Sequence, residues 1–231
     1  MFKNQGESRT LQHNLRIAII LSFVAGIVNV SGFLSIKQLT TNVTGHFALF
    51  IYDVANFKFL AGTIFLLYIL SFLFGSFVSS FLIEYFKRNK KLNVFVIPTL
   101  IEAIILVSIA LLSDLSILKA PNLIACLLLF AMGIQNSFVT KISNAVVRTT
   151  HLTGLFTDLG IDLSQLFFSK TYPDKKKIKS NIRLKGNIIC FFFLGGLFGG
   201  CLYSTANFKL NTLIVGAVIL MISLIYDDLK Y

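Results

Sequence analysis

The sequence has little charge and no tryptophan. Only 13% of its 231 residues are charged and 55% are hydrophobic, whereas soluble domains carry roughly 25% charged residues. This composition excludes an ordinary soluble domain and predicts a polytopic membrane protein. Because tryptophan is absent, any aromatic belt at the membrane surfaces has to come from the 7 tyrosines and some of the 24 phenylalanines.

Cysteine is also scarce. Cys126, Cys190 and Cys201 each lie inside an apolar run, and their spacing is not that of a metal site. We interpret them as small buried residues and expect neither a metal nor a cofactor. The sequence also lacks the motifs of serine hydrolases, zinc proteases and phosphate-binding loops. We therefore predict no catalytic residues and do not expect an enzyme.

Acidic residues are few, with 10 against 21 basic residues and a net charge of +11. The basic residues lie in short gaps between apolar runs, which is typical of cytoplasmic loops rather than of a nucleic-acid-binding surface. We therefore expect the lipid bilayer as a partner and no nucleic acid. A small solute, a proton or a cation is the expected ligand.

The apolar runs are long enough to cross a bilayer, which takes about 20 residues in a helix. The expected spans are Leu15–Ser35, Lys58–Phe86, Val94–Leu112, Leu123–Val139, Ile188–Ala206 and Leu210–Tyr226. Two further segments, 47–55 and 152–168, are preceded by polar, threonine-rich breaks in the apolar pattern, the first break at 40–45 and the second at 149–154. The first run is too long for a signal peptide and has no small-residue cleavage site, so we expect it to be a span.

The distribution of charge decides between topologies. Six spans with both termini in the cytoplasm place 17 of the 21 lysines and arginines on the cytoplasmic side, leaving Lys37, Lys58, Lys119 and Lys209 outside. Eight spans reduce the cytoplasmic number to 13, so the positive-inside rule favours six. The expected organisation is a cytoplasmic arm at 1–14, one membrane domain at 15–226 and a cytoplasmic tail at 227–231.

One polar motif occurs twice. Residues 40–45 read T-T-N-V-T-G and residues 149–154 read T-T-H-L-T-G, and the G-I-V-N at 26–29 matches the G-I-Q-N at 133–136. We infer two repeats, 15–114 and 122–226. Three spans per repeat is an odd number, so the second repeat enters the membrane in the opposite direction. The predicted fold is an all-α integral membrane protein with six transmembrane helices and two broken or re-entrant segments in an inverted 3+3 repeat.

Small residues also correspond between the repeats, at 75–80 and 195–200, and would let helices approach closely. Hydroxyl-rich breaks in an apolar chain are typical of sites where the backbone faces something other than lipid. We predict a substrate site where the two breaks meet, built from hydroxyls and helix N-termini. Its residues are Asn29, Thr40, Thr41, Thr44, Gly45 and His46, with Asn136, Arg148, Thr149, Thr150, His151, Thr153 and Gly154.

Each of these residues also has a structural interpretation. The threonines can cap helices, and Asn29 and Asn136 can form hydrogen bonds between helices. Arg148 can pair with Asp158, bind an anion or mark the cytoplasmic interface. Because His46 and His151 do not align with each other, a symmetric metal site is not predicted.

Three carboxylates are the candidates for ion or proton coupling. Asp158 and Asp162 are four residues apart and share one face of a helix. Asp53 aligns with Asp162 in the other repeat. Carboxylates inside membrane segments are costly and commonly mark ion or proton pathways. The alternative is that they lie at the acidic, water-facing end of a half-helix.

The second motif continues from Arg148 as R-T-T-H-L-T-G-L-F-T-D-L-G to Gly160. With the stretch from Gly26 to Gly45, it resembles the bacterial YoaK-type family of inner-membrane proteins, a domain-of-unknown-function family. The resemblance covers roughly 15–225; it implies a multi-pass protein of the bacterial inner membrane and no established activity. The family usually has asparagine where this chain has His46, so this chain lacks the amide side chain that a role at this position would use.

A small-solute or ion transporter is the function that these patterns favour. The alternatives are an intramembrane enzyme that acts on a lipid, with aspartate and histidine as acid and base, and a non-catalytic membrane scaffold. The patterns do not indicate the substrate, the coupling ion, the direction of transport or the oligomeric state.

Overall fold

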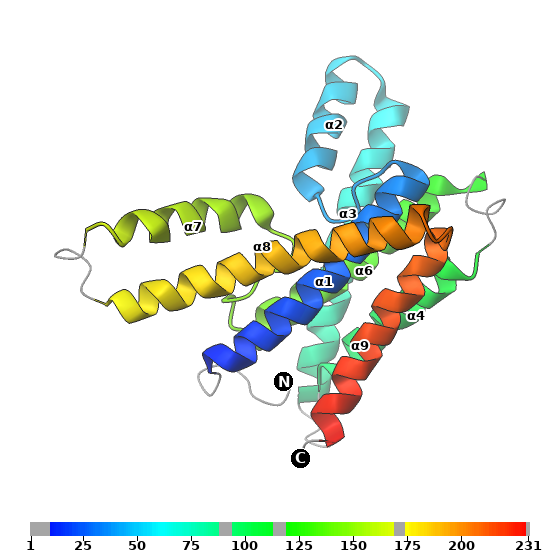
Figure 1. The fold of residues 1–231 in the computed structure, drawn as a ribbon. Coiled ribbons are helices and arrows are strands. Elements are labelled where there is room, and N and C mark those ends of the chain that lie inside the picture. Colours follow the sequence, from blue (N-terminus) through cyan, green and yellow to red (C-terminus); the bar gives the residue numbers. More distant parts are fainter. Residues whose placement is uncertain (1–9, 88–93, 113–118, 169–173, 230–231) are drawn as a thin grey trace.

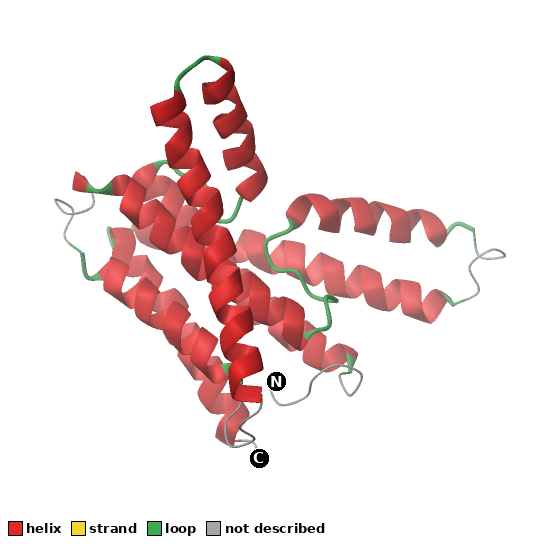
Figure 2. Cartoon of the chain, turned by 180° about the vertical axis from the view of Figure 1, so that it is seen from behind, coloured by secondary structure: helices red, strands yellow, loops and turns green. Residues whose placement is uncertain are grey.

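The computed structural model describes residues 10–87, 94–112, 119–168 and 174–229, and no strand occurs among them (Figure 2). The predicted all-α class is therefore confirmed for the described residues. The α-helices are α1 (Leu11–Ile36), α2 (Val43–Ala55), α3 (Phe59–Lys87), α4 (Val96–Ala110), α6 (Pro121–Ile142), α7 (Leu152–Gln165), α8 (Lys175–Ser204) and α9 (Thr212–Leu229), and the 3-10 helix η2 (Lys209–Asn211) precedes α9.

Within the described ranges four helices, α1, α3, α6 and α8, are long and apolar enough to cross a membrane. α4 and α9 are shorter, with 15 and 18 residues, so helix length alone does not establish six spans. α8 begins at Lys175 rather than at Ile188, because its basic first half continues the helix and Asp174 caps it by accepting a hydrogen bond from the Lys177 amide.

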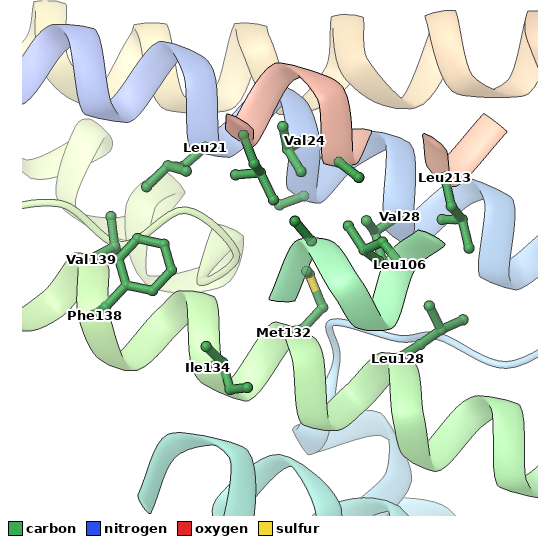
Figure 3. Packing of buried hydrophobic residues seen from close by; sticks show 14 of the residues in the cluster. Leu21, Val24, Val28, Leu106, Leu128, Met132, Ile134, Phe138, Val139 and Leu213 are labelled. Atoms are coloured by element: carbon green, nitrogen blue, oxygen red, sulfur yellow. The ribbon is translucent and has the colours of Figure 1, made fainter. Parts of the chain in front are cut away.

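The long helices pack in pairs that come from different halves of the chain. α1 lies along α8, and α3 lies along α6. α4 and α9 pack on each other. In addition, α4 packs on α6, and α9 packs on α1. Figure 3 shows the resulting core, in which Leu21 and Val24 of α1 lie near Leu106 of α4 and Met132 of α6. These four side chains are fully buried.

Glycines allow the paired helices to approach closely. A methyl group added to Gly26 of α1 would overlap the carbonyl oxygen of Phe192 in α8, and one added to Gly195 would overlap that of Phe23. The α3–α6 pair repeats this reciprocal contact between Gly75 and Phe130 and between Gly133 and Phe72. Gly75 and Gly195 of the predicted small-residue patches thus lie at helix crossings.

Two helical hairpins project from this bundle in different directions. α2 packs on the first half of α3, and α7 packs on the first half of α8 (Figure 1). Large apolar side chains cover the outer faces of α2 and α7, and Tyr52 and Phe156 are 60% and 58% exposed. Such surfaces are suited to lipid rather than to water, in agreement with a transmembrane protein.

Candidate functional site

The first polar break folds back along α1. The helix ends at Lys37, which adopts the left-handed conformation with φ 56°. The buried hydroxyl of Thr40 then donates to the Val28 carbonyl at 3.3 Å, and the Thr41 hydroxyl donates to Asn29 Oδ1 at 2.9 Å. At 1.5 Å per residue, Val28 lies about 12 Å before the end of α1. The chain therefore returns well into the bundle before α2 starts.

The second break does the same along α6. Positive φ angles at Asn144 and Ala145 reverse the chain. The side chain of Gln135 donates to the buried Thr149 hydroxyl at 3.2 Å, and the Thr150 hydroxyl donates to Asn136 Oδ1 at 2.7 Å. The predicted asparagines therefore hold each break against the helix that precedes it.

The helices that follow the breaks start in similar ways. Asn42 caps α2, and its Oδ1 accepts a hydrogen bond from the Gly45 amide at 2.9 Å. His151 takes the cap position of α7 without a side-chain hydrogen bond. A Cβ atom at Gly154 would lie 2.6 Å from His151 Nδ1, and one at Gly45 would lie 2.9 Å from Asn42 Nδ2. Each glycine thus leaves room for the side chain at the cap position. The N-cap residues of α2 and α7 are Asn42 and His151, so the threonines do not cap these helices.

Both breaks line one cavity of about 750 Å³. Nine of the predicted substrate-site residues face it, namely Asn29, Thr41, Thr44, Asn136, Arg148, Thr150, His151, Thr153 and Gly154. Sequence reasoning missed Asn42, Thr140, Phe72 and Phe192, which also line it. Asn42 lies inside the first motif and could have been included, whereas Phe72 and Phe192 belong to helices far away in the sequence.

Four predicted substrate-site residues lie behind the cavity wall. Thr40 and Thr149 are fully buried, and Gly45 lies under the Asn42 cap. His46 is also buried; its Nε2–H donates to the Leu39 carbonyl at 2.7 Å, and its ring packs edge-on against Tyr68 with centroids 5.0 Å apart. These contacts indicate that His46 fixes the path of the first break.

Arg148 is an exposed residue that lines the cavity, and it forms neither an ion pair nor a hydrogen bond with any described residue. The predicted alternative of an Arg148–Asp158 pair is therefore not what the structure contains. Instead, Lys185 Nζ of α8 lies 2.6 Å from Asp162 and 4.0 Å from Asp158. Sequence reasoning missed Lys185 because α8 was expected to begin at Ile188.

None of the three predicted coupling carboxylates lines the cavity. Asp162 is 6% exposed and Asp53 is 9% exposed, whereas the side chain of Asp158 is 58% exposed. Asp53 lies on α2 where that helix meets Gly62 of α3. A further carboxyl group, Glu102 of α4, is completely buried, and neither of its oxygens has a hydrogen-bond partner among the residues that the structure describes. No group of three or more metal-ligating side chains occurs in the described ranges.

Comparisons with known proteins agree with the sequence resemblance. A family model described as a protein of unknown function (DUF1275) matches residues 17–226. The chain is 28% identical over 182 residues to the UPF0700 transmembrane protein YoaK of Bacillus subtilis (strain 168), a match that spans 77% of this chain and 79% of that protein. No solved structure matches the chain.

Proposed function

We propose that this chain, which belongs to the DUF1275 family of proteins of unknown function, is a transporter for a small solute or ion. The observation that carries the proposal is the shared cavity: two copies of one polar motif, from opposite halves of an apolar chain, line the same space. First-turn amides of α2 and α7, hydroxyls, and the guanidinium of Arg148, which has no partner among the described residues, are groups that can hold a polar solute inside a bilayer.

The topology that we propose has six spans and two re-entrant segments. It is supported by the positive-inside count, by the way each break folds back along its preceding helix, and by the reciprocal packing of α1 on α8 and of α3 on α6. In this arrangement the two repeats are inverted. The first break opens to the outside and the second to the cytoplasm, so each can gate one side of the cavity.

Coupling to protons or cations is the role that we propose for the carboxylates outside the cavity. Asp162 holds α7 against α8 through Lys185. Neutralising this carboxylate would remove the ion pair and loosen the hairpin that carries the second break. Asp53 occupies the corresponding place on α2, and Glu102 is an additional candidate because an unpartnered carboxyl in a membrane bundle commonly marks a proton pathway.

The alternative of a lipid-modifying enzyme has less support. Its acid–base pair requires a carboxylate beside His151, but Asp158 lies next to Lys185 and no described aspartate or glutamate lines the cavity. A scaffold would need no cavity lined by polar groups. Neither alternative has an observation that favours it over transport.

A flux assay in proteoliposomes tests the proposal. Currents are recorded for a panel of small anions and cations, with wild-type protein and with the Thr153→Val/Asp158→Asn double variant. We expect the active solute to lose most of its flux in the variant, while the protein stays folded. Thr157→Val is the matched control, because Thr157 is one turn further along α7 and its hydroxyl bonds to the Thr153 carbonyl. Wild-type flux in the double variant would contradict the proposal.

A further inference from the structure

A second hollow adjoins the cavity. It is a groove of about 560 Å³ between α1, α7 and α8, and its walls include Val30, Phe156, Phe193 and Leu197. Leu152 and Phe192 line both the groove and the cavity. Both volumes fall in the range of about 300–1,000 Å³ that is typical of small-molecule sites. The two spaces therefore lie side by side and share one wall.

The two spaces differ in the polar groups that line them. No described aspartate or glutamate faces the cavity, whereas Arg148 does, and this guanidinium has no partner within the described parts of the chain. A guanidinium in a partly enclosed site favours a carboxylate or a phosphate. The groove is lined by apolar side chains and by Gly196, whose missing side chain leaves space next to Val30. Such a groove favours a hydrocarbon chain.

We infer that the site takes an anionic amphiphile, with its head group in the cavity near Arg148 and one hydrocarbon chain in the groove. This inference rests on the proposed function and names its substrate class. Phe156, Phe193 and Leu197 are 58%, 65% and 54% exposed on the outer surface of the α7–α8 hairpin. The chain can therefore enter sideways from the bilayer, without exposing its apolar part to water.

The corresponding face of the other half is more polar. When α8 is aligned with α3 at Gly195 and Gly75, Gly196 falls opposite Ser76. When α1 is aligned with α6 at Gly26 and Gly133, Val30 falls opposite Ser137. The Ser76 hydroxyl donates to the Gly133 carbonyl at 3.1 Å, across the α3–α6 crossing. The groove thus lies on the α1–α8 side of the molecule, where Val30 and Gly196 stand in place of the Ser137 and Ser76 of the α3–α6 side.

The absence of tryptophan from the chain allows a direct test. Phe193→Trp places the only tryptophan of the sequence in the groove, and Leu73→Trp places it at the corresponding position of α3 as the matched control. The full-length variants are titrated in nanodiscs with brominated decanoate, which quenches tryptophan on contact. We expect saturable quenching in the Phe193→Trp variant and only gradual, non-saturating quenching in the control variant. If Phe193→Trp does not fold, Phe156→Trp supplies the reporter from α7.

Competition distinguishes the head group from the chain. Unbrominated decanoate should reverse the saturable quenching, whereas acetate and decyltrimethylammonium should not. Arg148→Gln should weaken decanoate binding by about tenfold or more. Equal, non-saturating quenching of both reporters would show that the probe only partitions into the bilayer. Reversal of the quenching by decyltrimethylammonium would show that Arg148 does not select an anionic head group. Either result overturns the inference. Saturable binding without flux would instead refute transport while leaving the ligand class intact.

Discussion

Four glycines set the distance between the long helices. Gly26, Gly75, Gly133 and Gly195 each lie against a backbone carbonyl of the partner helix, and in each case that carbonyl belongs to the phenylalanine three residues before the partner's own glycine. The pattern F-x-x-G therefore lies at the crossing point of each of the four helices, so that each of the two crossings contains two copies. Without a Cβ atom at these positions the backbones can touch, which strengthens van der Waals packing in a membrane.

Substitution at one of these crossings should be costly. We expect Gly195→Ala to lower the free energy of unfolding by about 1–3 kcal/mol, because the methyl group would overlap the Phe23 carbonyl and backbone cannot move aside cheaply. Gly186→Ala on the same helix is the control, since nothing lies within 4 Å of the added atom; it should be neutral or stabilise the helix by up to about 1 kcal/mol. Thermal unfolding in detergent measures both. Equal melting temperatures would refute this role of the crossing.

Neighbouring residues of one motif have different surroundings. Thr40 is fully buried against the Val28 carbonyl, whereas Thr41 faces the cavity and bonds to Asn29. Likewise, Thr149 is fully buried and accepts a hydrogen bond from Gln135, whereas Thr150 faces the cavity and bonds to Asn136. The duplicated motif identifies all four threonines from the sequence, but which hydroxyl meets the cavity depends on how the break lies against its helix.

At the level of elements, Lys185 of α8 ties α7 to α8 through ion pairs with Asp162 and Asp158. Asp162 is almost completely buried where α7 packs on α8, and Lys185 is its partner at 2.6 Å. The lysine belongs to the basic first half of α8, which extends well beyond the apolar run. A helix can continue through polar residues when a neighbouring helix covers one of its faces, and hydropathy alone does not detect such an extension.

Removing the lysine should loosen this hairpin. We expect Lys185→Met to cost about 3–5 kcal/mol, because a buried carboxylate would be left without a cation. The Lys185→Met/Asp162→Asn double variant should recover much of that loss, and the exposed Lys179 offers a control substitution, Lys179→Met, with little effect. The free energies of unfolding of wild type, of the single variants Lys185→Met and Asp162→Asn, and of the double variant give the coupling energy. A Lys185→Met variant as stable as wild type would mean that the Lys185–Asp162 pair does not hold α7 against α8.

At the level of the whole molecule, the two halves pack on each other rather than side by side. The long helices that cross, α1 with α8 and α3 with α6, always combine one helix from each half. The hairpins built on α3 and α8 then bring the starts of α2 and α7 to one cavity. Neither half could form that cavity alone, which accounts for a duplicated motif in a single chain.

The six-span topology can be tested by cysteine labelling. In a background with Cys126, Cys190 and Cys201 replaced, single cysteines are introduced at the exposed positions Asn56, in the α2–α3 turn, and Asn144, in the turn after α6. We expect a membrane-impermeant maleimide added to intact cells to label Asn56→Cys at once and Asn144→Cys only after permeabilisation. Protection of Asn56→Cys from the outside would mean that α2 crosses the membrane.

The sequence by itself determined the class of the protein, its family and the two polar breaks, because composition, hydrophobic length and motif duplication are properties of the chain as such. Only the tertiary structure decided that the breaks share one cavity, that Lys185 rather than Arg148 pairs with the aspartates, and that an apolar groove adjoins the site. The physical reason is that side-chain partners are set by where helices cross. Those crossings depend on contacts between residues far apart in the sequence, which no local pattern records.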